Sequence, residues 1–340
     1  MKYLKKITIF QLGLIPATLV AGPAVAEINL FLLSIINIFF FYKNKETFLI
    51  KKYLKLIYLF IIFYATLILT SVLSEFIFYS LKNSLAYIRL GLYSFAIFYT
   101  LKNINNDNKK TIYSLFSITL CFLSIDAIIQ FYFKQNIIGF VSIYENQRIS
   151  GMFNEEYVLG SFLQKMVPIF LFLTFLYNRE VKITQLLVIS LIYLAIFISG
   201  ERSAFFLVSL FFLILIFTNH YIRKKIIIII SIFIIFVPFT LYQNFKLIER
   251  YSSIYSQVFD PDRFWEKKFI KENNSEVTNE IEVHKNNKGF YFFSFHHEMT
   301  FKSALKMFIS NPILGVGVKN FRKNCSQFSD NKYGCSTHPH

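Results

Sequence analysis

Long apolar segments alternate with short polar ones over residues 1–245. A helix needs about 20 mostly apolar residues to cross the hydrocarbon core of a membrane, and fewer where short loops constrain it. By this measure we expect residues 1–245 to form a transmembrane helical domain with nine helices. The expected segments are 7–20, 28–42, 53–72, 84–101, 111–133, 157–177, 184–199, 203–219 and 226–245.

The N-terminal segment allows two interpretations. Lysines precede its apolar run and Ala24-Val25-Ala26 suits a cleavage site, which together are typical of a secretory signal peptide. However, a second apolar segment follows at once from Ile28, and a membrane protein with this pattern needs no cleaved signal. We therefore favour an uncleaved first helix.

Lysine and arginine are distributed unevenly between alternate loops. Cytoplasmic loops of membrane proteins collect these residues. Counting the N-terminal segment as the first loop, the odd loops hold fifteen of them and the short even loops hold four. This bias predicts a cytoplasmic N-terminus and a large extracytoplasmic loop of residues 246–340. The four in the even loops are Lys82, Lys134, Arg148 and Arg202.

The expected outer loop has a polar part and an amphipathic part. Residues 261–289 are rich in Asn, Glu and Lys and are expected to be flexible. Over residues 296–310, apolar positions recur at helical spacing opposite lysines, which predicts an amphipathic helix. Such a helix either lies in the membrane interface or packs on the core of the loop. Its apolar positions are Phe301, Ala304, Leu305, Phe308 and Ile309.

Composition agrees with this pattern. The chain is 55% hydrophobic and 19% aromatic with 16% charged residues, which is typical of an all-α polytopic membrane protein. Its 36 Lys and Arg exceed its 20 Asp and Glu, but the basic residues lie between apolar segments and form no patch interleaved with aromatic residues. We therefore expect the lipid bilayer, and no nucleic acid, as a partner.

Two cysteines, Cys325 and Cys335, lie ten residues apart in the expected outer loop. An oxidising compartment would let them form a disulfide that stabilises the loop by roughly 2–4 kcal/mol. It would also hold the segment His338-Pro339-His340 against the preceding chain. Zinc is the alternative, because these side chains are suitable ligands, but the spacing of a common zinc site is missing and no metal is expected.

Arginines at membrane depth are the main candidates for binding. Arg89 lies within an expected helix, Arg148 just before another, and Arg202 in a very short turn. An arginine at this depth is costly unless it meets an anion, and its planar fork suits the oxygens of a diphosphate. Snorkelling to lipid headgroups is the alternative for Arg148 and Arg202. Asp126 also lies at membrane depth and is a candidate partner for one of these arginines.

Four histidines lie in the expected outer loop: His296, His297, His338 and His340. A neutral imidazole can accept a proton near pH 7. A single histidine is usually structural. His338 and His340 flank a proline beside the expected disulfide, so a positioned base is as good an interpretation for them as a structural role.

Several segments together resemble the O-antigen ligase and polymerase family of bacterial envelope glycosyltransferases. They occur in the family's order, although each alone is weak. The resemblance covers residues from about 126 to 340, and the first four expected helices match in hydropathy alone. The matching segments are RISGMFNEEYVLGSFL (148–163), ISGERSAFFLV (198–208), SALKMFISNPILGVGVKNFR (303–322) and CSTHPH (335–340).

The resemblance implies a glycosyltransferase of the bacterial inner membrane that works at the periplasmic face. It implies a glycan donor carried on undecaprenyl diphosphate, an acceptor such as the lipid A core or a growing glycan, and no cofactor or metal. Arg148 and Arg202 would neutralise the diphosphate, with Arg89 and His338 as further binding residues. The family's catalytic base, a histidine normally followed by Asn, corresponds to His340.

The chain also departs from the family. Members often carry an arginine at the start of the outer amphipathic helix, where this chain has His296-His297-Glu298. The chain stops within the motif around His340, so we expect a longer complete protein with further membrane helices. His297 and Arg322 are retained as possible supporting residues.

Three functions are compatible with these features. The first is a ligase that transfers the glycan to a lipid A core, and the second is a polymerase that extends a lipid-linked glycan. The third is a transporter of an anionic lipid or glycan, suggested by the charged residues at membrane depth. A transporter predicts charges along a path across both leaflets, whereas the short-loop arginines gather on the expected outer side.

Overall fold

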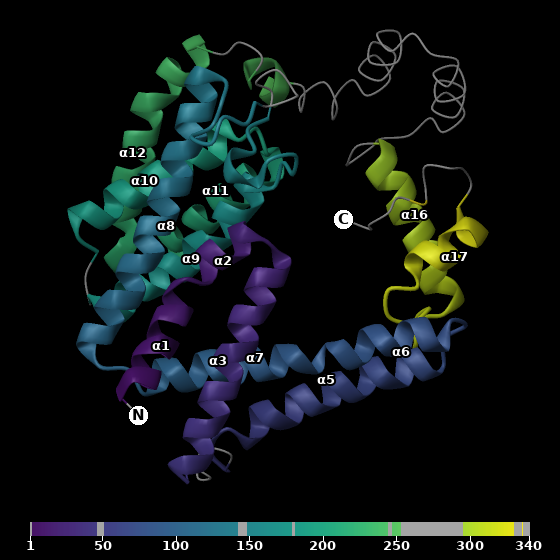
Figure 1. Ribbon diagram of the computed structural model, residues 1–340. Coiled ribbons are helices and arrows are strands. Elements are labelled where there is room, and N and C mark those ends of the chain that lie inside the picture. Colours follow the sequence, from purple (N-terminus) through teal and green to yellow (C-terminus); the bar gives the residue numbers. More distant parts are fainter. Residues whose placement is uncertain are drawn as a thin grey trace, which may run out of the picture. The chain divides into compact units, whose positions relative to one another are not determined.

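The computed structural model describes residues 2–45, 51–141, 148–178, 181–243, 247–252, 295–329 and 335. Over these residues the chain is all-α, as expected, with turns and one isolated β-bridge between Gln135 and Val141 (Figure 1). It divides into two compact units. Unit 1 comprises Met1–Phe40 and Phe95–Tyr251, and unit 2 comprises Phe41–Ser94 and Ser252–His340.

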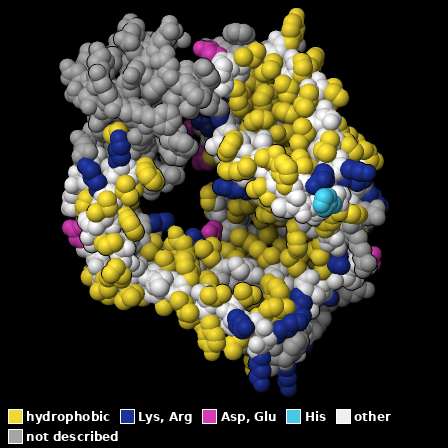
Figure 2. Space-filling view, turned by 180° about the vertical axis from the view of Figure 1, so that it is seen from behind, with side chains coloured by type: hydrophobic (Ala, Val, Ile, Leu, Met, Phe, Trp, Pro, Cys, Tyr) yellow, Lys and Arg dark blue, Asp and Glu magenta, His cyan; other side chains and the backbone are white. Residues whose placement is uncertain are grey.

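Six of the described helices are long and apolar enough to cross a membrane, and a bent pair is a seventh candidate. Two shorter apolar helices, α10 (Ile183–Ile198) and α11 (Arg202–Thr218), cover the seventh and eighth expected segments. This is the pattern of a multi-pass membrane protein, while nine separate spans stay a prediction. Figure 2 agrees, because hydrophobic side chains cover much of the helical surface it presents.

The boundaries differ from expectation where the backbone is broken. The first expected helix, 7–20, is the bent pair of α1 (Lys2–Gly13) and α2 (Ile15–Ala21), which meet at 60°. Pro16 lies in the first turn of α2 and cannot donate a backbone hydrogen bond, so a continuous helix is disfavoured there. The fourth expected helix, 84–101, begins earlier, because α6 (Ile77–Ala86) leads into α7 (Ile88–Lys102).

Unit 1 is a helical bundle with a largely hydrophobic core. Its central helix, α10, is apolar all round, and Ile189, Ile192 and Ile196 on it are fully buried. It packs against α8, α9 and α12. Its other helices include α3 (Pro23–Lys43), α8 (Asn106–Phe133), α9 (Leu159–Tyr177) and α12 (His220–Gln243).

Unit 2 contains a helical hairpin and two C-terminal helices. The hairpin pairs α5 (Leu54–Val72) with α6 through buried serines, because Ser80 donates to the hydroxyl of Ser71 over 2.9 Å. Helix α16 (Phe295–Ser310) covers the residues for which an amphipathic helix is predicted, and α17 (Phe321–Phe328) follows it.

The apolar positions predicted on α16 face outward, as do Lys302 and Lys306, and a further side of the helix is buried. Phe301 is 61% exposed and Phe308 is 58% exposed, whereas Met299, Ser303 and Met307 are buried. These apolar side chains of α16 were predicted to lie in the membrane interface or to pack on the core of the loop. They do not pack within the described part of unit 2.

Candidate anion-binding site

Two loops and a short helical segment of unit 1 meet where α10 ends. The N–H of Ile149 donates to the carbonyl of Ser199 over 3.1 Å, which joins the α8–α9 loop to the α10–α11 turn. After α12, Arg250 donates from Nε to the carbonyl of Gly200 over 2.6 Å, and the Tyr251 hydroxyl donates to the carbonyl of Phe197 over 2.9 Å. We call the resulting group of Arg148, Glu201, Arg202 and Arg250 the arginine corner.

Glu201 fixes the α10–α11 turn to the start of α9. Its carboxylate accepts hydrogen bonds from the N–H groups of Gly160, over 2.7 Å, and Ser161, over 3.1 Å, and also from the Ser161 hydroxyl. These amides lie in the first helical turn and lack intrahelical partners, so a buried carboxylate caps them from another helix. Glu201 is 6% exposed. Arg202, the next residue, begins α11 from this clamped turn.

Gly160 permits this close approach. A Cβ atom at residue 160 would lie 2.9 Å from the Cβ of Glu201, a distance that side chains do not tolerate. Gly160, the second of two glycines in the family-like segment 148–163, therefore has a packing role at the site.

Arg148 is held by the chain that follows it. Its Nη2 donates to the carbonyl of Tyr157 over 2.9 Å, and its guanidinium carbon lies 5.3 Å from the centre of the Tyr157 ring. Both contacts orient the planar guanidinium group.

The arginines act on one another electrostatically. Burial, followed by the positive charges of Arg148 and Arg202, lowers the pKa of Arg250 to about 10. Arg250 therefore remains charged at neutral pH. Among the described residues, the carboxylate of Glu201 lies near these guanidinium groups, and its oxygens accept hydrogen bonds from backbone amides. Three guanidinium groups gathered in this way suit a multiply charged anion, because their N–H donors can bind its oxygens.

Asp126 supports the α8–α9 loop. It is fully buried, and its Oδ1 accepts the N–H of Ile137 over 2.9 Å. Among the described residues, Oδ2 has no hydrogen-bond partner, so the expected pairing with an arginine is not formed. The reason is local, because the loop turns back over the end of α8 and places its own amide on the carboxylate.

The other predicted site residues lie in unit 2 or outside the described residues. Arg89 on α7 and Arg322 on α17 are exposed in unit 2. His297 belongs to α16, but its side chain lies outside the described parts, as do His338 and His340. Cys325 and Cys335 are joined by a disulfide, with Cα atoms 5.5 Å apart.

The turn before α17, residues 315–320, is held by close packing, and we call it the glycine turn. Gly315 and Gly317 have φ angles of 64° and 91°, a region that favours glycine. A Cβ atom at residue 317 would lie 2.9 Å from the hydroxyl oxygen of Ser74, whereas at residue 315 it would meet no atom within 4 Å. Lys323 lies 4.3 Å from the ring centre of Tyr79 and extends this contact onto α6.

Sequence reasoning missed Glu201 and Arg250. In the sequence, Glu201 stands out only as the neighbour of Arg202. An acidic residue in a short turn does not indicate which helix it caps. Arg250 follows the last expected apolar segment, where basic residues are common, and only the fold returns it to the turn at Gly200. No three His, Cys, Asp or Glu side chains in the described ranges group closely enough to hold a metal ion.

The fold and the site define a class: a multi-pass, all-α membrane protein with a group of arginines at one end of a helical bundle. Residues 185–340 match the family model of O-antigen ligase, which confirms the predicted resemblance over this part of the chain. The matched range includes Glu201, Arg202 and Arg250, and Arg148 precedes it. No curated protein and no solved structure matches the chain.

Proposed function

We propose that this protein transfers a glycan from undecaprenyl diphosphate to a hydroxyl group of a lipid A core or similar acceptor at the periplasmic membrane face. The observation that carries the proposal is the arginine corner, together with the O-antigen ligase match that includes most of it. A diphosphate is a good leaving group once its charge is neutralised. Three guanidinium groups held by a protein scaffold supply that neutralisation without moving during the reaction.

The reaction is a single displacement. The acceptor oxygen attacks the anomeric carbon of the donor sugar, and the bond from that carbon to the diphosphate oxygen breaks. The electron pair of this bond stays with the diphosphate, where Arg148, Arg202 and Arg250 stabilise the added charge. In this proposal, His340 takes the acceptor's hydroxyl proton as general base, and the new glycosidic bond has inverted configuration.

The distribution of charge favours an enzyme over a transporter. The arginine corner joins the ends of α10 and α12 to the start of α9 and α11, and so lies at one end of unit 1. At the other end, Arg223 donates to the carbonyl of Ile216 at the α11–α12 turn. A transport path needs charge along the bundle. Between these two ends, α10 carries no charged side chain and α11 carries only Arg202 at its first residue, which suits a site for a lipid headgroup at that end.

The proposal is tested with the purified full-length protein in lipid nanodiscs. The donor is an undecaprenyl-diphosphate glycan, the acceptor is lipid A core, and EDTA is present. We expect transfer by the wild type and a loss of about 100-fold or more in His340→Ala, because a general base typically contributes 10²–10⁴-fold. Arg223→Ala, which changes an arginine at the opposite end of unit 1, is the matched control and should transfer normally.

The products decide between the alternatives. Glycan on the lipid A core identifies a ligase, and elongated carrier-linked chains identify a polymerase. Normal transfer by His340→Ala would refute the base assignment. Absence of both reactions, with translocation of the labelled lipid across the membrane instead, would support a transporter.

A further inference from the structure

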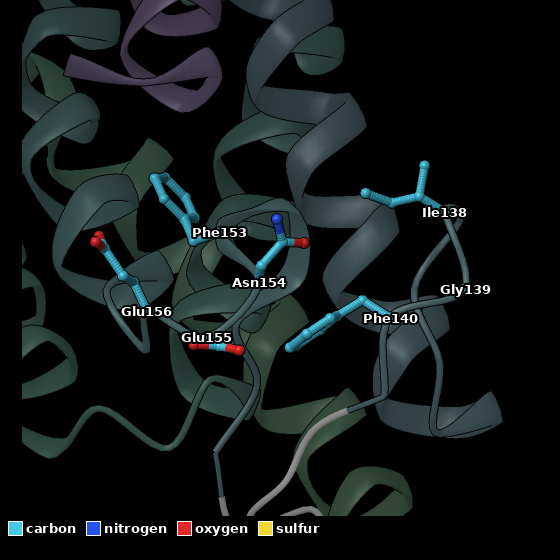
Figure 3. A pocket seen from close by; sticks show the side chains of 7 residues that line it. All are labelled: Ile138, Gly139, Phe140, Phe153, Asn154, Glu155 and Glu156. Carbon is cyan, nitrogen blue, oxygen red and sulfur yellow. The ribbon is translucent and has the colours of Figure 1, made fainter. Parts of the chain in front are cut away.

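An open groove of about 720 Å³ lies within the α8–α9 loop of unit 1. Figure 3 shows Ile138, Gly139 and Phe140 on one rim, and Asn154 and Glu155 on the other. Its volume falls in the range of roughly 300–1,000 Å³ that small-molecule sites occupy. The groove is therefore large enough to hold a sugar residue with its neighbour.

The groove is formed before any ligand arrives. The buried side chain of Asn136 joins both rims: its Nδ2 donates to the carbonyl of Gly151 over 2.9 Å, and its Oδ1 accepts the N–H of Phe140 over 2.8 Å. Gln130, also buried, accepts the N–H of Gly151 over 2.7 Å. A rim held in this way loses little conformational entropy on binding.

The lining combines flat aromatic surface with hydrogen-bonding groups. Phe140 and Phe153 contribute rings, Asn154 contributes an amide, and Glu155 and Glu156 contribute carboxylates. Carboxylates accept hydrogen bonds and repel anions, so a phosphate is a poor ligand. A sugar fits better, because its C–H faces pack on aromatic rings while its hydroxyl groups donate to carboxylates.

The second rim continues directly into the arginine corner. Glu156 is followed by Tyr157, whose carbonyl accepts the hydrogen bond from Arg148. A molecule with its diphosphate at the arginines would therefore find the groove next along the same loop. The corner gathers guanidinium groups, which suit the anionic diphosphate of a glycosyl diphosphate. The groove carries carboxylates, which suit the hydroxyl groups of its sugars.

We propose that this groove is a carbohydrate subsite that binds sugar residues beyond the reacting one. The proposal rests on the proposed function, and the sugar can belong to the donor glycan or to the acceptor. Phe140 provides the stacking surface, and Glu155 accepts hydrogen bonds from ring hydroxyl groups.

The test uses the full-length protein in nanodiscs and two donors that share one lipid diphosphate. One donor carries the complete glycan, and the other is trimmed by exoglycosidases to its first sugar. The variants are Phe140→Ala and Glu155→Gln, and the control is Phe217→Ala, whose 72% exposed side chain lies near the end of α11 away from Arg202. Size-exclusion profiles and thermal unfolding verify that each variant folds.

We expect KM for the complete donor to rise about 3- to 10-fold in each groove variant, with kcat and the trimmed donor unaffected. A rise confined to KM for the acceptor would equally support a carbohydrate subsite and would assign it to the acceptor. Unchanged KM values for both substrates in active variants would overturn the subsite alone.

If the wild type transfers no glycan, this result counts against the proposed function. The carbohydrate subsite is then tested by measuring glycan binding directly. In that case, saturation-transfer NMR with the lipid-free glycan provides the answer. Contact signals that weaken in Phe140→Ala but persist in Phe217→Ala would support the groove. Equal or absent signals in all proteins would reject it.

Discussion

The arginine corner of unit 1 and the glycine turn of unit 2 both contain segments of the family's sequence pattern, but they are built in opposite ways. In the corner, long polar side chains reach across the bundle and bond backbone groups of other loops. In the turn, the absence of a side chain at Gly317 lets the backbone approach Ser74. Substitutions in the corner should therefore change electrostatics and chemistry, whereas substitutions in the turn should change packing first.

Arg202→Ala tests the corner most severely. Loss of one positioned charge that stabilises a transition state typically costs 10²–10³-fold in kcat, and we expect a loss of about that size in glycan transfer. Arg202→Lys keeps the charge without the planar fork and should recover activity only in part. Transfer rates measured with a saturating donor check this, and full activity of Arg202→Ala would remove Arg202 from the mechanism.

Glu201→Ala should affect both stability and activity. It leaves the amides of Gly160 and Ser161 without their acceptor, which costs about 1–3 kcal/mol in the free energy of unfolding for a buried group. Activity should fall as well, because the turn that carries Arg202 is released from α9. Thermal unfolding and transfer rates are compared with those of Glu201→Gln, whose carbonyl retains one acceptor and should restore part of both. Equal behaviour of the two variants would contradict the capping role.

Arg250→Gln should separate activity from stability. We expect kcat/KM for the donor to fall about 10-fold, as for loss of a charge-assisted hydrogen bond. The pKa of Arg250 in the folded protein, about 10, lies below its usual value. The buried charge therefore costs stability fully below pH 10, and this cost disappears gradually as the pH rises from 10 toward the usual pKa of arginine. At pH 7 the variant should therefore unfold no more easily than the wild type. A marked loss of stability there would show that the contact with Gly200 outweighs the buried charge.

The smallest effect is expected for substitutions of the two glycines in the glycine turn of unit 2. They test whether this turn depends on close packing. Gly315→Ala and Gly317→Ala both place a side chain at positive φ, which costs about 1 kcal/mol or somewhat more. Only the second also meets Ser74 and Asn320. Limited proteolysis should therefore cleave near the turn faster in Gly317→Ala than in Gly315→Ala. Equal cleavage of the two would mean that backbone strain alone matters.

Much of the helical architecture followed from the chain's hydropathy. The apolar segments and the amphipathic pattern at residues 296–310 correspond to described helices, since a period of 3.6 residues is a local property. Their ends were less predictable. The bend between α1 and α2 and the early start of α6 depend on how the broken backbone packs.

Within the site, local motifs indicated Arg148 and Arg202, because arginine in short loops between apolar segments is unusual on its own. Asp126 was expected to pair with an arginine, but its Oδ1 accepts a backbone hydrogen bond instead. Its neighbour is the amide of Ile137, eleven residues away, and the sequence offers no sign of that hydrogen bond.

By itself, therefore, the sequence determined the class of protein, its helical segments and the residues of the ligase-like motifs, because hydropathy and short motifs are properties of neighbouring residues. Only the tertiary structure decided that Arg250 joins Arg148 and Arg202, that Glu201 caps α9, and that one loop forms a groove beside them. The hydrogen bond from Arg250 to Gly200 alone links residues fifty positions apart. They depend on which helix ends meet, and packing of the whole bundle sets that arrangement.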